Sequence, residues 1–183
     1  QQAFRKGDKA KLTQLLPSAR GHVLEPWAAY WELKARLDEA SADEVLGFFK
    51  RWPGTYQEDR LRNDWLLLLG QRRDWGMFDQ VHGAFRMRDD RSVSCYALLI
   101  DSIKGQPAAN LGQQVRDLWW AQRDADDGCT YAAGELYAAK LEAAGVIAAE
   151  GGKALVDAYR DKLDSGEVTT ELAKVEKTPA TSK

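Results

Sequence analysis

Apolar residues recur every three to four positions through most of the chain, which is the spacing of one face of an α-helix. Between residues 26 and 37, for example, Trp27, Tyr30 and Leu37 fall on one face. No segment shows the alternation of apolar and polar residues that is typical of a half-buried β-strand. The pattern therefore predicts an all-α fold.

Capping residues and helix breakers divide this pattern into segments of helical length. Asp8, Ser41 and Asp74 are residue types that accept a hydrogen bond from the first turn of a helix. Glu44, three residues after Ser41, completes the pattern of a capping box, and Ser92 would begin a further helix. The predicted helices cover residues 8–16, 26–37, 41–52, 55–72, 74–81, 92–103 and 107–119, and an eighth begins at Cys129.

Turns between paired helices recur at a regular interval. They lie at Leu37-Asp38, Arg72-Arg73 and Lys104-Gly105, so the two intervals are nearly equal. Helix-turn-helix repeats have a similar period, of about 34 residues, and stacked repeats bury one continuous core. The spacing favours antiparallel helix pairs stacked as an α-solenoid or superhelix. An irregular bundle of antiparallel helices would give similar spacing and stays open as the alternative.

Large aromatic residues are concentrated in the first two thirds of the 183-residue chain. All seven tryptophans and all five phenylalanines lie before residue 121, and alanine becomes frequent afterwards. Because large rings fill the gaps between helices, the well-packed core should lie in the earlier part. We expect a superhelical repeat domain over residues 1–137, additional helices over 138–167 and a frayed polar tail over 168–183.

The charge balance and the apolar content limit the class of protein. The chain has 26 basic and 28 acidic residues, a formal net charge of −2, which does not favour a nucleic-acid partner. The longest apolar run, residues 65–69, is far shorter than the ~20 residues of a membrane-spanning helix. No signal peptide stands at the start, so we expect a chain that is cytoplasmic or already processed.

The residue types that catalyse reactions or bind metals are scattered. His22 and His82 stand far apart along the chain, and no cluster of potential ligands has metal-binding spacing. No glycine-rich phosphate loop occurs, and no cofactor is expected. Asp89-Asp90 and Asp126-Asp127 lie in turn-like stretches, where we expect solvated carboxylates without the raised pKa of a general acid. The sequence predicts no catalytic site.

Cys95 and Cys129 are the only two cysteines. In a reducing compartment they would be two independent, small core residues, whereas in an oxidising compartment they would form one disulfide. Their separation matches one repeat period, so they would lie in neighbouring layers of a solenoid. From the residues alone, both states stay open.

A series of short motifs follows in a characteristic order between residues 1 and 137. The motifs are Phe4-Arg5-Lys6-Gly7-Asp8, Leu15-Leu16-Pro17, Pro26-Trp27-Ala28-Ala29-Tyr30-Trp31, Phe49-Lys50-Arg51-Trp52-Pro53, Arg60-Leu61-Arg62, Arg72-Arg73-Asp74-Trp75, Cys95-Tyr96 and Asp127-Gly128-Cys129. In this order and spacing, residues 1–137 resemble the N-terminal, U-shaped superhelical region of soluble lytic murein transglycosylases.

The resemblance implies a scaffold in the bacterial periplasm. Enzymes of that family cleave the β-1,4 bond between N-acetylmuramic acid and N-acetylglucosamine in peptidoglycan and leave a 1,6-anhydro end. Their catalytic glutamate lies in a C-terminal lysozyme-like domain, whose Gly-Leu-Met-Gln motif is absent here. The resemblance thus implies a non-catalytic region that contacts glycan strands or the catalytic domain, with Cys95 and Cys129 as a disulfide. Trp119 and Trp120 are candidates for stacking on sugars, although core packing is the simpler role of each.

Two alternatives accompany this interpretation. A tetratricopeptide-like module without enzymatic role would bind a protein partner in its concave groove, and an autonomous enzyme is a third hypothesis. Residues 136–167 resemble a helical segment of the thiamine-dependent component of the 2-oxoglutarate dehydrogenase complex. That match contains no thiamine or metal motif, so it is either a chance likeness or the mark of a composite C-terminus.

Overall fold

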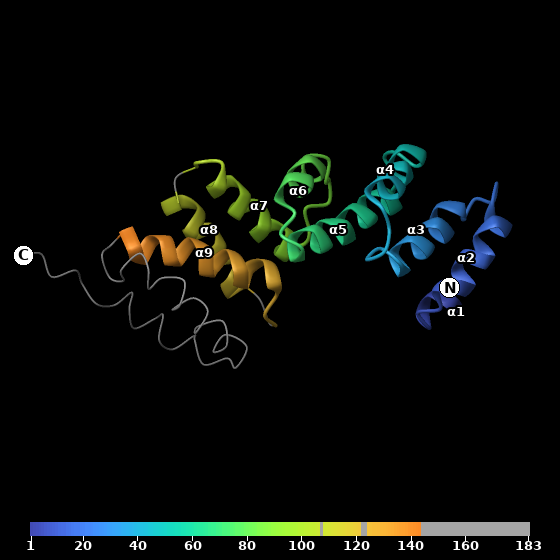
Figure 1. Ribbon diagram of the computed structural model, residues 1–183, viewed down its shortest axis with the longest axis horizontal. Coiled ribbons are helices and arrows are strands. Elements are labelled where there is room, and N and C mark those ends of the chain that lie inside the picture. Colours follow the sequence, from blue (N-terminus) through green and yellow to red (C-terminus); the bar gives the residue numbers. More distant parts are fainter. Residues whose placement is uncertain (107, 122–123, 144–183) are drawn as a thin grey trace, which may run out of the picture. The chain divides into compact units, whose positions relative to one another are not determined.

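The computed structural model describes residues 1–106, 108–121 and 124–143 (Figure 1). Within these residues every regular element is a helix, as the periodicity predicts. None of these helices has both the length and the apolar character that a bilayer crossing requires. The chain divides into two compact units, Gln1–Asp90 and Arg91–Lys183, a division that the sequence pattern did not predict.

The first unit consists of short helices joined by tight turns. Helix α5 contacts both α3 and α6, and α3 also contacts α2. A ring contact of 6.0 Å between the centroids of Phe49 and Trp65 joins α4 to α5. The elements are α1 (Gln2–Arg5), α2 (Lys9–Leu15), the 3₁₀ helix η1 (Leu16–Ala19), α3 (Glu25–Ala35), α4 (Ala42–Arg51), α5 (Tyr56–Gln71) and α6 (Trp75–His82).

Side-chain caps fix where these helices begin. Asp8, Thr55 and Asp74 each accept a hydrogen bond from a backbone N–H in the first turn of α2, α5 and α6. Ser41 and Glu44 form the predicted capping box at the start of α4, each side chain bonding to the other's backbone N–H. A cap satisfies N–H groups that have no partner inside the helix. The caps at Asp8, Ser41 and Asp74 were predicted, whereas Thr55 was predicted only as the start of a helix.

The core of the first unit is aromatic and aliphatic. Val45, Leu61, Leu66 and Phe78 are completely inaccessible to solvent. Burial of such apolar side chains stabilises this unit. The other buried apolar residues are Leu12, Ala29, Tyr30, Leu33, Leu37, Phe48, Phe49, Trp65, Leu69, Val81 and Phe85.

The second unit contains three described helices: α7 (Arg91–Ile103), α8 (Ala108–Trp120) and α9 (Asp127–Ala143). Helix α9 packs against both α7 and α8 (Figure 1). The approach of α9 to α7 is close at Gly128, where a Cβ atom would lie 2.2 Å from the backbone oxygen of Ser92. Only glycine fits this position without moving the backbone of α7.

Several expectations need adjustment. Helix α7 begins at Arg91, so Ser92 lies inside its first turn instead of capping it, and its hydroxyl accepts a hydrogen bond from Gly128 N. The expected boundary at residue 137 falls within α9. Most of the expected helical segment 138–167 and the whole tail 168–183 lie outside the described residues.

Candidate functional site

A disulfide joins Cys95 on α7 to Cys129 on α9. The two Cα atoms are 4.9 Å apart, and both cysteines are completely buried. The pairing agrees with the one that the family resemblance implies. The two cysteines are separated by 34 positions in the sequence. The bond links the first and the last described helix of the second unit.

Two acidic residues at the start of α9 make further contacts with α7, beside the disulfide. Asp126 accepts hydrogen bonds from Arg91 Nε at 2.9 Å and from Cys129 N at 2.8 Å, and Asp127 accepts one from the hydroxyl of Tyr96. We expected solvated carboxylates, but these two hold the start of α9 against α7. Sequence reasoning missed this because Arg91 and Tyr96 belong to a different helix, far from the two acids along the chain.

The two candidate sugar-stacking tryptophans have different environments. Trp119 is buried, with 8% of its surface exposed, whereas Trp120 is 52% exposed. Their ring centroids lie 5.6 Å apart in a tilted arrangement. Only Trp120 therefore offers a large ring surface to a partner.

The two histidines have different surroundings. His22 is exposed in the loop after η1, and its Nδ1 accepts a hydrogen bond from Leu24 N at 3.0 Å. His82 stacks on Phe78 at the end of α6, with a centroid distance of 5.5 Å. No group of three or more potential ligands that could hold a metal occurs in the described part of the chain.

A buried cluster of charged residues on α5 was not predicted from the sequence. Glu58, Asp59 and Arg62 are all buried. Glu58 forms ion pairs with Arg62 and, at 2.8 Å, with Arg86, and it accepts a hydrogen bond from Gly54 N. Burial raises the pKa of Glu58, but the bonds from Arg86, Arg62 and Gly54 outweigh burial and lower the pKa below its ordinary value. Glu58 is therefore held as a carboxylate.

Asp59 fastens the segment after α6 to α5. Its carboxylate accepts hydrogen bonds from the backbone N–H groups of Arg86 at 3.0 Å and Met87 at 2.8 Å. Arg60 pairs with Asp89 at 3.2 Å farther along the same segment. The sequence spacing of Glu58 and Arg62 is that of an ordinary surface ion pair, so only the tertiary packing reveals that this pair is buried.

A second polar group links α3 to α5. Tyr30 donates a hydrogen bond to Asp64 at 2.8 Å, and Lys34 Nζ lies 2.8 Å from the other carboxylate oxygen. Burial and the nearby Asp64 carboxylate raise the pKa of Tyr30. Burial lowers the pKa of Lys34, but the hydrogen bond and charge of Asp64 outweigh burial and raise it. The neutral phenol and the ammonium are thereby stabilised, which opposes a role for either as a general base.

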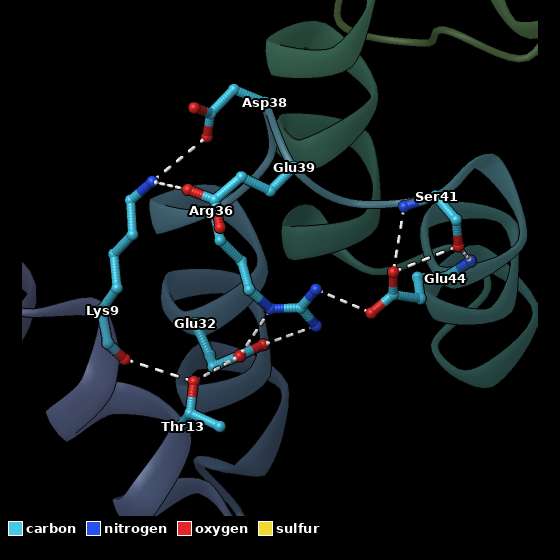
Figure 2. Close-up of polar contacts among 8 residues, drawn as sticks. All are labelled: Lys9, Thr13, Glu32, Arg36, Asp38, Glu39, Ser41 and Glu44. Carbon is cyan, nitrogen blue, oxygen red and sulfur yellow. Dashed lines mark hydrogen bonds and ion pairs between the residues drawn. The ribbon is translucent and has the colours of Figure 1, made fainter.

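A third polar network crosses from α2 to α4 (Figure 2). Glu32 on α3 accepts hydrogen bonds from Thr13 Oγ1 at 2.9 Å and from Arg36 Nε at 2.7 Å. Arg36 also reaches Glu44, at 2.7 Å, so the capping box of α4 is tied to α3. The network thus joins three helices in succession, and it has the character of structural support.

Comparison of the chain with models of protein families, with curated proteins and with solved structures finds no match. The polar groups described above are engaged in helix caps, ion pairs between helices and the surroundings of the disulfide. The comparisons therefore assign neither a family nor a function to the chain.

Proposed function

We propose that this chain is a non-catalytic α-helical scaffold region of a periplasmic peptidoglycan lytic transglycosylase, with its helix pairs stacked as a superhelix. The parent enzyme would cleave the bond between N-acetylmuramic acid and N-acetylglucosamine with a 1,6-anhydro product, in cell-wall turnover. The observation that carries the proposal is the ordered series of motifs in residues 1–137. Its last two members, at Cys95 and Cys129, meet in a disulfide between α7 and α9.

The oxidised cysteine pair supports the proposed compartment. Disulfides persist in oxidising environments such as the bacterial periplasm and are rare in the cytosol. The purified protein is unfolded in denaturant without reductant and titrated with a thiol reagent. This titration should find no free thiol. Two reactive thiols at Cys95 and Cys129 would instead favour a cytosolic, tetratricopeptide-like interaction module.

The proposed work of this region is geometric. Caps, inter-helix ion pairs and the disulfide hold the helices in fixed positions, and a rigid element positions a ligand more accurately than a loop does. The exposed ring of Trp120 provides one surface on which a sugar of a glycan strand can stack. The partners would be glycan strands and a lysozyme-like catalytic domain supplied elsewhere.

Co-sedimentation with purified murein sacculi tests the proposal. The chain should pellet with the sacculi and release no soluble anhydro-muropeptides. Trp120→Ala should lower the bound fraction, whereas Ile103→Ala, which removes an apolar side chain that is 62% exposed in the same unit, should not. Absence of co-sedimentation would refute a peptidoglycan scaffold, and release of anhydro-muropeptides at enzymatic rates would refute the non-catalytic role.

A further inference from the structure

A cavity of about 770 Å³ lies in the first unit, between α1, α2, η1 and α3. Cavities of roughly 300–1,000 Å³ are typical of sites for small ligands. The residues of this cavity belong to none of the polar networks between α3, α4 and α5 described above. It therefore needs a separate explanation.

The lining of the cavity combines apolar residues, called the floor below, with polar and charged residues, called the rim. Leu12, Leu15 and Trp31 contribute larger surfaces, and Ala19 and Ala28 leave room beside them. Leu15 is 47% exposed although it is a large apolar residue. Trp31 stacks on Phe4 with a centroid distance of 5.9 Å, so one face of its ring is already covered. The floor therefore suits small aliphatic groups better than the broad face of a sugar.

The rim of the cavity offers hydrogen-bond donors, of which the two lysines carry a positive charge. Lys6 lines the cavity and pairs with no carboxylate in the part of the chain that the structure describes. Among residues 1–106, 108–121 and 124–143, Lys11 Nζ meets only a neutral acceptor, Gln14 Oε1 at 3.2 Å. His22 also lines the cavity, and since its Nδ1 accepts a hydrogen bond from Leu24 N, its Nε2 carries a proton that can be donated.

The acidic group on the same rim is already engaged. Asp8 lines the cavity, but its carboxylate caps α2 by accepting a hydrogen bond from Lys11 N at 2.9 Å. Lys9, by contrast, is directed to Asp38 and Glu39 and is paired with both (Figure 2). Basic residues clearly outnumber acidic ones over residues 1–20, where Asp8 is the single acid. The charge around the cavity therefore favours a ligand with carboxylates.

We propose that this cavity binds the stem peptides of peptidoglycan, which are short peptides with several carboxylates beside alanine methyl groups. The alanine side chains would enter the floor between α2 and α3, and the carboxylates would meet Lys6, Lys11 and His22. This inference rests on the proposed function, because it takes peptidoglycan as the polymer that the scaffold contacts. It differs from sugar stacking at Trp120 in its site and in its chemistry.

Calorimetric titration with two soluble probes tests the assignment. The probes are the free stem tetrapeptide and the same tetrapeptide with its carboxylates amidated. The wild-type chain should bind the free tetrapeptide, more weakly as salt concentration rises, and should bind the amidated one at least roughly 10-fold more weakly. Lys6→Glu with Lys11→Glu should weaken binding of the free tetrapeptide by a similar factor.

Further variants test whether the loss of binding is specific to the cavity. Lys50→Glu reverses an exposed charge at the end of α4, outside the cavity, and should leave the affinity unchanged. Leu15→Ala removes an apolar contact from the floor at an exposed position and should weaken binding several-fold without unfolding the unit. Circular dichroism of each variant checks that its helices are intact. If the Lys6→Glu/Lys11→Glu variant does not fold, Lys6→Gln replaces it in the same binding measurement.

The outcomes separate this inference from the proposed function. Binding to sacculi without binding to the free tetrapeptide would overturn the stem-peptide site and leave the scaffold proposal standing. Equal affinity of wild-type and Lys6→Glu/Lys11→Glu chains for the tetrapeptide would also overturn it. Tighter binding of an acidic peptide of protein composition than of the stem peptide would identify the site as a protein-docking surface and refute the assignment.

Discussion

Removal of the disulfide gives the sharpest quantitative expectation. The bond between Cys95 and Cys129 closes a loop of 34 residues. In the chain-entropy description, opening a loop of n residues raises the entropy of the unfolded chain by about 2.1 + 1.5R ln n cal/mol/K. For this loop, that entropy multiplied by the temperature is a free energy of about 3.8 kcal/mol at 25 °C. The Cys95→Ala/Cys129→Ala variant should therefore lose about 3.8 kcal/mol of unfolding free energy in the second unit.

Hydrogen exchange followed by mass spectrometry locates this loss. The bond lies between α7 and α9, both in the second unit. A change of about 3.8 kcal/mol corresponds to a roughly 500-fold rise in the equilibrium for opening. The slowest-exchanging amides of α7 and α9 should lose protection by that factor. Amides of α5, in the first unit, should lose far less.

Two results would refute this reasoning. Unchanged protection of α7 and α9 in the double-alanine variant would mean that packing alone holds the unit together. An equal loss in α5 would mean that the two units unfold as one. Addition of reductant provides the control, because it should destabilise the wild-type chain and leave the double-alanine variant unaffected.

Polar contacts in the first unit give three more measurable effects. Ser41→Ala removes the capping box of α4 and should lower the free energy of unfolding by about 1 kcal/mol in urea denaturation; Ser18→Ala, outside the helix caps, should change it by less than about 0.5 kcal/mol. Asp59→Asn weakens the acceptor for the N–H groups of Arg86 and Met87 and should cost about 1–3 kcal/mol by calorimetry; an unchanged stability would mean that this carboxylate does not hold the segment. The folded-state pKa of Glu58 is lowered, so its contribution is complete above its ordinary pKa of 4.5 and is lost as pH falls through the lowered value. Glu58→Gln should therefore reduce the difference in unfolding free energy between about pH 6 and pH 3; an undiminished difference would contradict the ion pairs assigned to Glu58.

The helical fold could be predicted from the sequence because its signals are local. The caps at Asp8, Ser41, Thr55 and Asp74 are each formed within a single turn, and the apolar periodicity needs only neighbouring residues. Ser92 shows the limit of such reasoning. It has the right residue type for a cap, but its hydroxyl is taken by Gly128, which belongs to another helix.

Which of the candidate side chains are buried and which are exposed could not be predicted from local sequence patterns. Trp119 and Trp120 are adjacent in sequence, and only the rotation of α8 against its neighbours decides that the first is buried and the second exposed. The charges of Glu58 and Arg62 have the spacing of a surface pair, yet both residues are buried. Arg86, in the segment after α6, pairs with Glu58, and the guanidinium of Arg62 lies over the ring of Phe49 on α4.

The sequence by itself determined the helices, their ends and the absence of strand-like patterns, since these follow from backbone hydrogen bonding and from the spacing of apolar side chains. The tertiary structure decided the division after Asp90, the pairing of Cys95 with Cys129 and the cavity beside Lys6 and Lys11. These features depend on distances between residues that are far apart along the chain. Such distances are fixed only when the helices pack, because each packing choice depends on all the side chains that meet there.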